Sequence, residues 1–335
     1  MKKILNQKID TYATYTDDFS SPTQTHFFVQ YYDIESELFQ EKYIDSKLTS
    51  LKGISQIFIE NVLYLCGNNL DNISLENSET TSNNNTNSNN NINNEDINNK
   101  ILTINSFSSS FMFSIDLAKE PLTMSYEVNS SHLHYYPSLS ILRSEYIIVI
   151  SGYKSKKCEY YSISNKRWKD LPDIPEERYG TNILIDNTSN LIYLFGGFNE
   201  QNGKNCRSIL KLNVNSCIKW NTILISEKEG LIEKNFCCVI KKLNGKFLIL
   251  GGKDDFDRPC NDIIEVDIKS KQINIQKYLN DNVKLGNNVY FKSLRTGIES
   301  KKNYFMFDDE EEKIYKIDEK YSNVILLNNN EKKNL

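Results

Sequence analysis

The feature that most constrains this chain is an internal repeat. A large apolar residue, usually followed by Asp, Asn or Ser, is matched by a second large apolar residue seven positions later. The pairs are Tyr32 with Phe39, Ile115 with Leu122, Tyr161 with Trp168, Leu212 with Trp220 (one residue longer), Val266 with Ile273, and Ile317 with Val324. Without an Asn-rich segment between the first two, their starts lie about 50 residues apart, a period that in a β-rich chain predicts radially repeated sheets.

Each repeat after the first also contains an apolar run that ends in glycine or in a small or polar pair. The runs occupy residues 62–67, 147–152, 191–197, 246–252 and 303–309. An uninterrupted apolar run is typical of a strand covered on both faces. Glycines at its end permit a positive φ and a close approach of neighbouring backbone.

Each repeat therefore predicts four strands, and the Tyr and Phe content supports this because these residues favour pleated, half-buried surfaces. In the best-preserved repeat we expect strands at about 181–185, 191–196, 208–214 and 217–223. One thin sheet cannot cover both of its faces, so stacking around an axis is expected. The predicted fold class is an all-β propeller of four-stranded blades, with six blades favoured and five as the alternative.

The two ends and one insertion depart from the repeat. The first repeat has candidates for third and outer strands at 26–33 and 37–44, and its inner strands are either weakly encoded in 8–15 or absent. Residues 1–25 are expected as an N-terminal segment, 26–328 as the propeller, and 329–335 as a tail. The Asn-rich stretch at about 71–100 is predicted to be a disordered loop, because it has too little apolar surface to offset the entropy of ordering.

These motifs resemble the kelch-repeat β-propeller family. The family pattern is an apolar run ending in Gly-Gly, then a Tyr, then a Trp about seven residues later. Its structural positions fall here on Gly152, Tyr161, Trp168, Gly196, Gly197, Trp220, Gly251 and Gly252. Residues 167–172 followed by 178–180 also resemble the kelch passage between blades. The doublet is replaced in the last repeat by Asp308-Asp309, which leaves individual blade boundaries open.

Composition narrows the range of functions. The formal net charge is −4, without the basic excess that nucleic-acid binding requires. No stretch of about 18 apolar residues occurs, so no membrane span is expected. The seven Cys are odd in number and form no CxxC pair, which favours reduced, mostly buried thiols. The expected location is the cytoplasm.

The sequence nominates no catalytic residue, metal site or cofactor. His132 and His134 would share one face of a strand, yet a third metal ligand is missing, so we interpret them as ordinary strand residues. The adjacent Cys237 and Cys238 would point to opposite faces of a strand and be buried. The acidic run 308–312 is interpreted as a solvated turn.

With no catalytic or metal site nominated, the candidate functional site is the surface formed by the loops. In a propeller, the loops between second and third strands and those between blades open on the same face. These loops offer aromatic and Arg side chains, which are frequent binding anchors. The predicted partner-binding residues are Tyr153, Arg178, Tyr179, Phe198, Arg207, Phe256 and Arg258. The alternative is that several of them pack between blades.

The resemblance implies a non-catalytic scaffold or substrate-recognition module that binds a protein or peptide. Neither nucleic acid nor a membrane is expected as a partner. The alternative function is a propeller enzyme or a sugar-like ligand binder that uses the central channel. The incomplete first repeat also leaves open that the chain is part of a longer protein.

Overall fold

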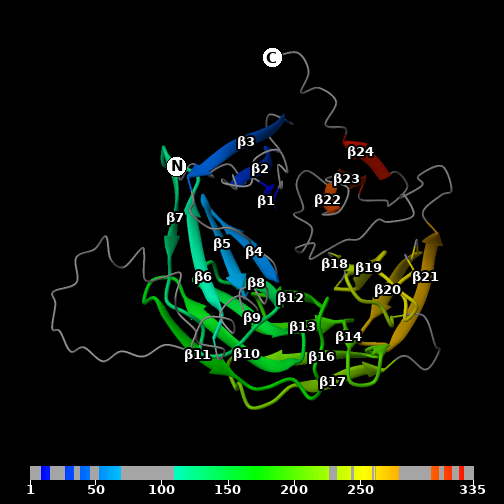
Figure 1. Cartoon of the computed structure of the whole chain (residues 1–335). Coiled ribbons are helices and arrows are strands. Elements are labelled where there is room, and N and C mark those ends of the chain that lie inside the picture. The colour runs from blue at the N-terminus through cyan, green and yellow to red at the C-terminus, as the bar shows by residue number, and fades with distance from the viewer. Residues whose placement is uncertain are drawn as a thin grey trace, which may run out of the picture.

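A computed structural model describes residues 9–15, 27–33, 38–45, 53–68, 109–225, 232–242, 245–258, 260, 262–278, 303–308, 313–318 and 324–327. Within these ranges every regular element is a β-strand and no helix occurs (Figure 1). The predicted all-β class is therefore confirmed. The Asn-rich insertion, residues 309–312 and the tail 329–335 lie outside the described residues.

Three successive repeats form four-stranded antiparallel sheets in which neighbours in sequence pair. The second sheet contains β8 (Ser138–Leu142), β9 (Tyr146–Gly152), β10 (Ser155–Ser162) and β11 (Arg167–Leu171). The third contains β12 (Asn182–Asp186), β13 (Leu191–Phe195), β16 (Ser208–Asn213) and β17 (Asn221–Ile225). The fourth contains β18 (Cys238–Lys241), β19 (Phe247–Leu250), β20 (Asp262–Asp267) and β21 (Gln272–Tyr278). A short hairpin, β14 (Phe198–Asn199) and β15 (Lys204–Asn205), lies where a plain loop was expected.

The N-terminal repeats differ from the expected pattern. The first sheet contains β4 (Ile54–Ile59), β5 (Val62–Gly67), β6 (Phe111–Asp116) and β7 (Leu122–Tyr126). Before it, β1 (Ile9–Tyr15), β2 (Phe27–Asp33) and β3 (Leu38–Asp45) form an antiparallel meander, so the weakly encoded strand in 8–15 is β1. This meander is not a separate sheet, because β3 pairs in parallel with β7 at Ile44 and Leu122 and extends the first sheet to seven strands.

The C-terminal repeat contributes three antiparallel strands. They are β22 (Asn303–Asp308), β23 (Lys313–Asp318) and β24 (Val324–Leu327). The apolar segment 288–291, a strand candidate in the sequence, lies outside the described residues. In Figure 1 the sheets follow one another around a common centre, from β1–β7 through the green third sheet to the red C-terminal strands.

The seven-residue spacing has a simple structural cause, because in four repeats its two residues are cross-strand partners. The pairs are Tyr32 with Phe39, Tyr161 with Trp168, Val266 with Ile273, and Ile317 with Val324. The other two repeats differ. Ile115 lies opposite Met124 instead of Leu122, and Trp220 lies one residue before β17.

The core lies between successive sheets. In β9, Ile147 and Val149 pack with Ile57 and Tyr64 of the first sheet. The alternate residues of the same strand, Ile148 and Ile150, pack in a second cluster with side chains of the third sheet. A further cluster joins the third sheet to the fourth, with Phe195 against Phe247. Apolar residues at every position of a central strand are thus required because both of its faces are covered.

The first strands of successive repeats lie beside one another. β1 contacts β4, β4 contacts β8, β8 contacts β12, and β12 contacts β18. Side chains tie them together, because Ser138 Oγ donates to Thr181 O at 2.8 Å and Asn182 Nδ2 donates to Cys237 O at 3.3 Å. Stacked four-stranded antiparallel sheets with adjacent first strands are typical of a β-propeller-like fold.

Candidate functional site

A buried basic side chain recurs in the connection that enters each of three sheets. His134, Arg178 and Lys234 each lie four residues before the first residue of β8, β12 and β18. All three side chains are buried. Sequence reasoning missed this position, although the recurrence of a basic residue at a fixed distance before each first strand is a signal that could have revealed it. We call these three residues the basic latches.

Two of the basic latches, Arg178 and Lys234, bind the first residue of the third strand of their own sheets. Arg178 Nη1 donates to Ser208 O at 2.8 Å and to Gly196 O at 3.2 Å. Lys234 Nζ pairs with Asp262, the first residue of β20. Each buried cation therefore has polar partners, which a charge removed from water requires.

The glycine pairs allow the latch backbone of the next sheet to approach closely. Gly152 N donates to Arg178 O at 3.3 Å, and Gly197 N donates to Lys234 O at 2.9 Å. At Gly196 the φ angle is 58°, and a Cβ there would lie 2.0 Å from Lys234 O. The glycine that follows each apolar run is thus needed for contact between sheets.

The two tryptophans also hold neighbouring sheets together, Trp168 from the outer strand β11 and Trp220 from the residue before β17. Trp168 Nε1 donates to Val128 O at 2.7 Å, and Trp220 Nε1 donates to Pro172 O at 2.8 Å. Both acceptors belong to the connection that leaves the preceding sheet. Each indole therefore holds its sheet to the sheet before it.

A buried carboxylate joins the first and second sheets. Tyr161 Oη and Lys166 Nζ each donate to Glu127 Oε2 at 2.8 Å, and Ser114 Oγ donates to Oε1 at 2.8 Å. Burial alone would raise the pKa of Glu127, but these hydrogen bonds outweigh it and lower that pKa below its ordinary value. The charged form of Glu127 is thus stabilised by folding.

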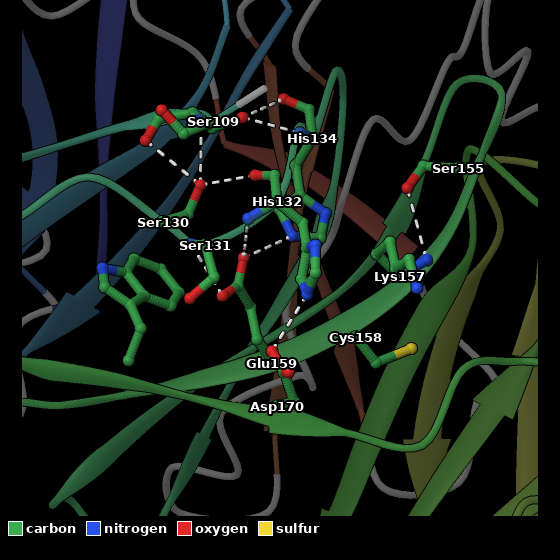
Figure 2. Close-up of polar contacts among 12 residues, drawn as sticks. Ser109, Ser130, Ser131, His132, His134, Ser155, Lys157, Cys158, Glu159 and Asp170 are labelled. Carbon is green, nitrogen blue, oxygen red and sulfur yellow. Dashed lines mark hydrogen bonds and ion pairs between the residues drawn. The ribbon is translucent and has the colours of Figure 1, made fainter. Parts of the chain in front are cut away.

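The two histidines do not share a strand face, and that prediction is wrong. Both lie in the connection between β7 and β8, and Figure 2 shows Glu159 pointing into this connection. Glu159 accepts from Ser131 N at 3.0 Å and lies 2.8 Å from His134 Nε2. His132 Nε2 instead lies 2.9 Å from Asp170 Oδ1.

The imidazole of His134 contacts an oxygen atom at each of its two ring nitrogens. The second ring nitrogen of His134, Nδ1, lies 2.7 Å from Ser151 O, so both ring nitrogens face oxygen atoms inside the protein. His134 and Glu159 are fully buried. Among the described residues no group of three or more His, Cys, Asp or Glu is placed to hold a metal ion.

The seven cysteines are free thiols, and five of them are buried. Burial is the main reason why the pKa values of Cys158, Cys206 and Cys237 are raised to about 12. These thiols are therefore protonated and unreactive at neutral pH.

Arg178 does not belong to the exposed loop surface on which it was predicted. Its side chain is fully buried, and besides the two carbonyls it binds Glu176 through Nη2 at 2.6 Å. The physical reason is that its guanidinium provides donors that the ends of β13 and β16 need. We therefore withdraw it as a contact residue.

Three other predicted residues are brought together. Tyr153, Tyr179 and Phe198 are half-buried and lie in ring contact, with centroids 5.5 Å apart for the first two and 5.7 Å for the last two. Tyr179 also forms backbone hydrogen bonds with Phe198 in both directions. The rings meet edge to face, an arrangement that aromatic pairs prefer.

The row of rings extends over three sheets to residues that sequence reasoning missed. Tyr135 contacts Tyr153 at 6.2 Å and Tyr136 at 4.7 Å, and Phe236 contacts Tyr179 at 6.1 Å. We call the six residues the aromatic ladder: Tyr135, Tyr136, Tyr153, Tyr179, Phe198 and Phe236. All lie at the end of the sheets where the first strands begin and the second strands finish.

The remaining predicted residues lie apart from the ladder rings. Arg207 Nε lies 3.0 Å from Glu233 Oε1, and the Arg207 side chain is partly exposed. Phe256 is 77% exposed, and the Arg258 guanidinium lies 4.8 Å from its ring centroid. Arg258 also pairs with Asp254. Asp254, Phe256 and Arg258 form an exposed turn after β19, whereas Arg207 lies directly before β16.

No helix among the described residues is long and apolar enough to cross a membrane. Comparison of the chain with protein-family models and with curated proteins gave no match.

Proposed function

We propose that this chain is a non-catalytic interaction module of the kelch-repeat β-propeller type. In this proposal six blades stack around an axis, and the meander β1–β3 is the irregular first blade. Support comes from the stacked four-stranded sheets, from the adjacent first strands and from the cross-strand pairs behind the seven-residue spacing. The closely packed glycine pairs Gly196-Gly197 and Gly251-Gly252 also agree with it.

The proposed activity is the binding of a protein or peptide at the end of the sheets that carries the aromatic ladder. The observation that carries the proposal is the row of half-buried rings that runs through three successive sheets without a break. Tyr and Phe bind with little loss of side-chain freedom and supply a large contact area, so they are efficient anchors. Loops held by a rigid scaffold are also where binding residues are concentrated.

The cytoplasm is the proposed location. The seven free cysteines support it, because thiols of this number persist in reducing compartments.

Affinity capture with the full chain tests this function. Tyr153→Ala and Tyr179→Ala together should abolish recovery of a specific partner from a lysate, because they interrupt the ladder at its centre. Ile218→Ala is the matched control, since Ile218 is 77% exposed and lies before β17, outside the ladder. Recovery of the same proteins with all three chains, each folded by circular dichroism, would refute the proposed surface.

A further inference from the structure

We infer that the segment bound by the aromatic ladder is basic and that an Arg or Lys side chain of this segment lies against Tyr179 and Glu200. This inference rests on the proposed function and specifies the chemistry of the partner. Four observations at the same end of the sheets support it.

The first observation is that this surface already receives ammonium groups. Lys154 Nζ lies 5.0 Å from the Tyr153 ring centroid, and Lys253 Nζ lies 5.9 Å from the Phe236 ring centroid. Tyr179 lies between these two rings and contacts both. Within the described part of the chain, no Lys or Arg lies over the Tyr179 ring. The central ring of the ladder is therefore a candidate acceptor for a cation from a partner.

The second observation is a set of carboxylates in the connections beside the ladder, of which Glu200 acts on Tyr179. Glu200 is exposed, and its Oε1 lies 3.5 Å from Tyr153 Oη. Glu177 accepts from Gln201 N at 3.2 Å, and Asp255 accepts from Asn205 N at 2.7 Å. None of these three carboxylates forms an ion pair with a cation among the residues that the structure describes. A partner that carries positive charge would supply the missing counter-ion.

The third observation concerns buried acceptors beside the ladder. Asn205 lies opposite Phe198 in the β14–β15 hairpin, and Asn235 precedes Phe236. Asn205 Nδ2 and Asn235 N both donate to Lys253 O, which places the two residues together.

The oxygens of these two amides accept hydrogen bonds and donate none. Both side chains are at least nine-tenths buried, and their Oδ1 atoms accept no hydrogen bond from the described residues. Any donor, neutral or charged, satisfies such atoms, and guanidinium and ammonium groups are compatible with them because these groups carry donors and no acceptor.

The fourth observation is the electrostatic environment of Tyr179. Its pKa is raised, first by burial and then by the charges of Glu200 and Asp257 and by Tyr153. Negative potential at this hydroxyl agrees with the geometry. Lys204 is the exposed cation nearest in sequence on the same hairpin, and a basic partner has to approach against its charge.

The test is a selection of peptides from a random phage-displayed library on the immobilised full chain. The affinities of the selected peptides are then measured by fluorescence anisotropy. We expect enrichment in Lys and Arg.

Tyr179→Leu should weaken binding roughly three- to thirtyfold, the range of a cation–π contact. Glu200→Lys should weaken it about fivefold or more, Lys204→Glu should strengthen it, and added salt should weaken it. Ile218→Lys is the charge control away from the ladder.

The outcomes separate the inference from the function on which it rests. Peptides that depend on Tyr179 but are neutral or acidic, and that ignore Glu200→Lys, overturn the inference and leave the proposed function standing. Failure to select any peptide, or selection of peptides that bind Tyr179→Leu as well as the native chain, overturns both. Basic peptides with the expected responses to all four substitutions support both.

Discussion

Replacing Gly196 by Ala tests the close contact between the third and fourth sheets. Gly196 has a φ of 58°, and a Cβ built there lies 2.0 Å from Lys234 O. The left-handed backbone costs a residue with a Cβ roughly 1–2 kcal/mol. The overlap also forces Lys234 O away from Gly197 N, which now donates to it at 2.9 Å. Loss of that buried hydrogen bond costs a further 1–3 kcal/mol or so.

Gly203 provides a matched control for this substitution. Its φ is 65°, so Ala there meets nearly the same backbone penalty, but a Cβ meets no atom within 4 Å. We therefore expect Gly203→Ala to reduce the free energy of unfolding by about 1–2 kcal/mol. For Gly196→Ala we expect a loss of about 2–5 kcal/mol, the sum of the two contributions, which is a large part of the stability of a typical domain.

Urea titration of both variants, followed by tryptophan fluorescence, measures the difference. Trp168 and Trp220 lie in the second and third sheets and both hydrogen bond to a preceding sheet, so their emission reports on this region. Equal midpoints for the two variants, with unchanged slopes, would refute the argument that close packing between sheets requires glycine at position 196.

Three further predictions follow from the burial and charge of single side chains. Iodoacetamide should label Cys217 and Cys260 in the native protein and leave the five buried cysteines unlabelled until urea is added, as mass spectrometry would show; early labelling of a buried thiol would contradict this. Folding lowers the pKa of Glu127, so its contribution to stability is complete above about pH 5 and is lost as the pH falls through the folded value. Glu127→Gln should therefore flatten the dependence of the melting temperature on pH between about pH 5 and 3. An unchanged dependence would contradict this. Arg178→Met should reduce the free energy of unfolding by about 3 kcal/mol because two buried carbonyls lose their donor, whereas Arg178→Lys should lose less; equal urea midpoints for the two would contradict the role of the latch.

The sheets were predictable from the sequence because their signals are local. An apolar run such as 191–197 must be a strand covered on both faces, and the structure has β13 there. The seven-residue spacing of Tyr161 and Trp168 was predictable as a pair of strands joined by a tight turn, since these residues turn out to be cross-strand partners. The expected strands at 181–185 and 208–214 agree with β12 and β16 to within one residue at each end.

The parallel pairing of β3 with β7 could not be predicted in the same way. It joins Ile44 to Leu122 across more than one repeat, and no spacing within a repeat encodes which edge an irregular first unit will meet. The β14–β15 hairpin was missed for a different reason. Two-residue strands carry too few residues to show a period of two, so 198–207 resembles any polar loop.

The misplacement of Arg178 shows where sequence reasoning about the candidate site was weakest. A charged residue in a loop is usually exposed, and neither its type nor its neighbours distinguish Arg178 from Arg207, which is partly exposed. In the sequence, only the recurrence of a basic residue four positions before each first strand distinguishes them, and the cause of the burial is tertiary. Arg178 is buried because the carbonyls of Gly196 and Ser208 face its guanidinium in the folded sheet.

The buried latches lie in the same short connections as half-buried rings of the ladder, so a change at a latch affects both the stability of the fold and the binding surface. Arg178 points inward and the next residue, Tyr179, is half-buried in the ladder; His134 and Tyr135 repeat the arrangement one sheet earlier. Lys234 is followed by Asn235 and then by Phe236, whose ring contacts Tyr179. Because the latch and the ring are only one or two residues apart in each connection, fixing the backbone at the latch also restrains the ring. A latch substitution that leaves the chain folded should therefore weaken binding by displacing the ladder, although the latch itself touches no partner.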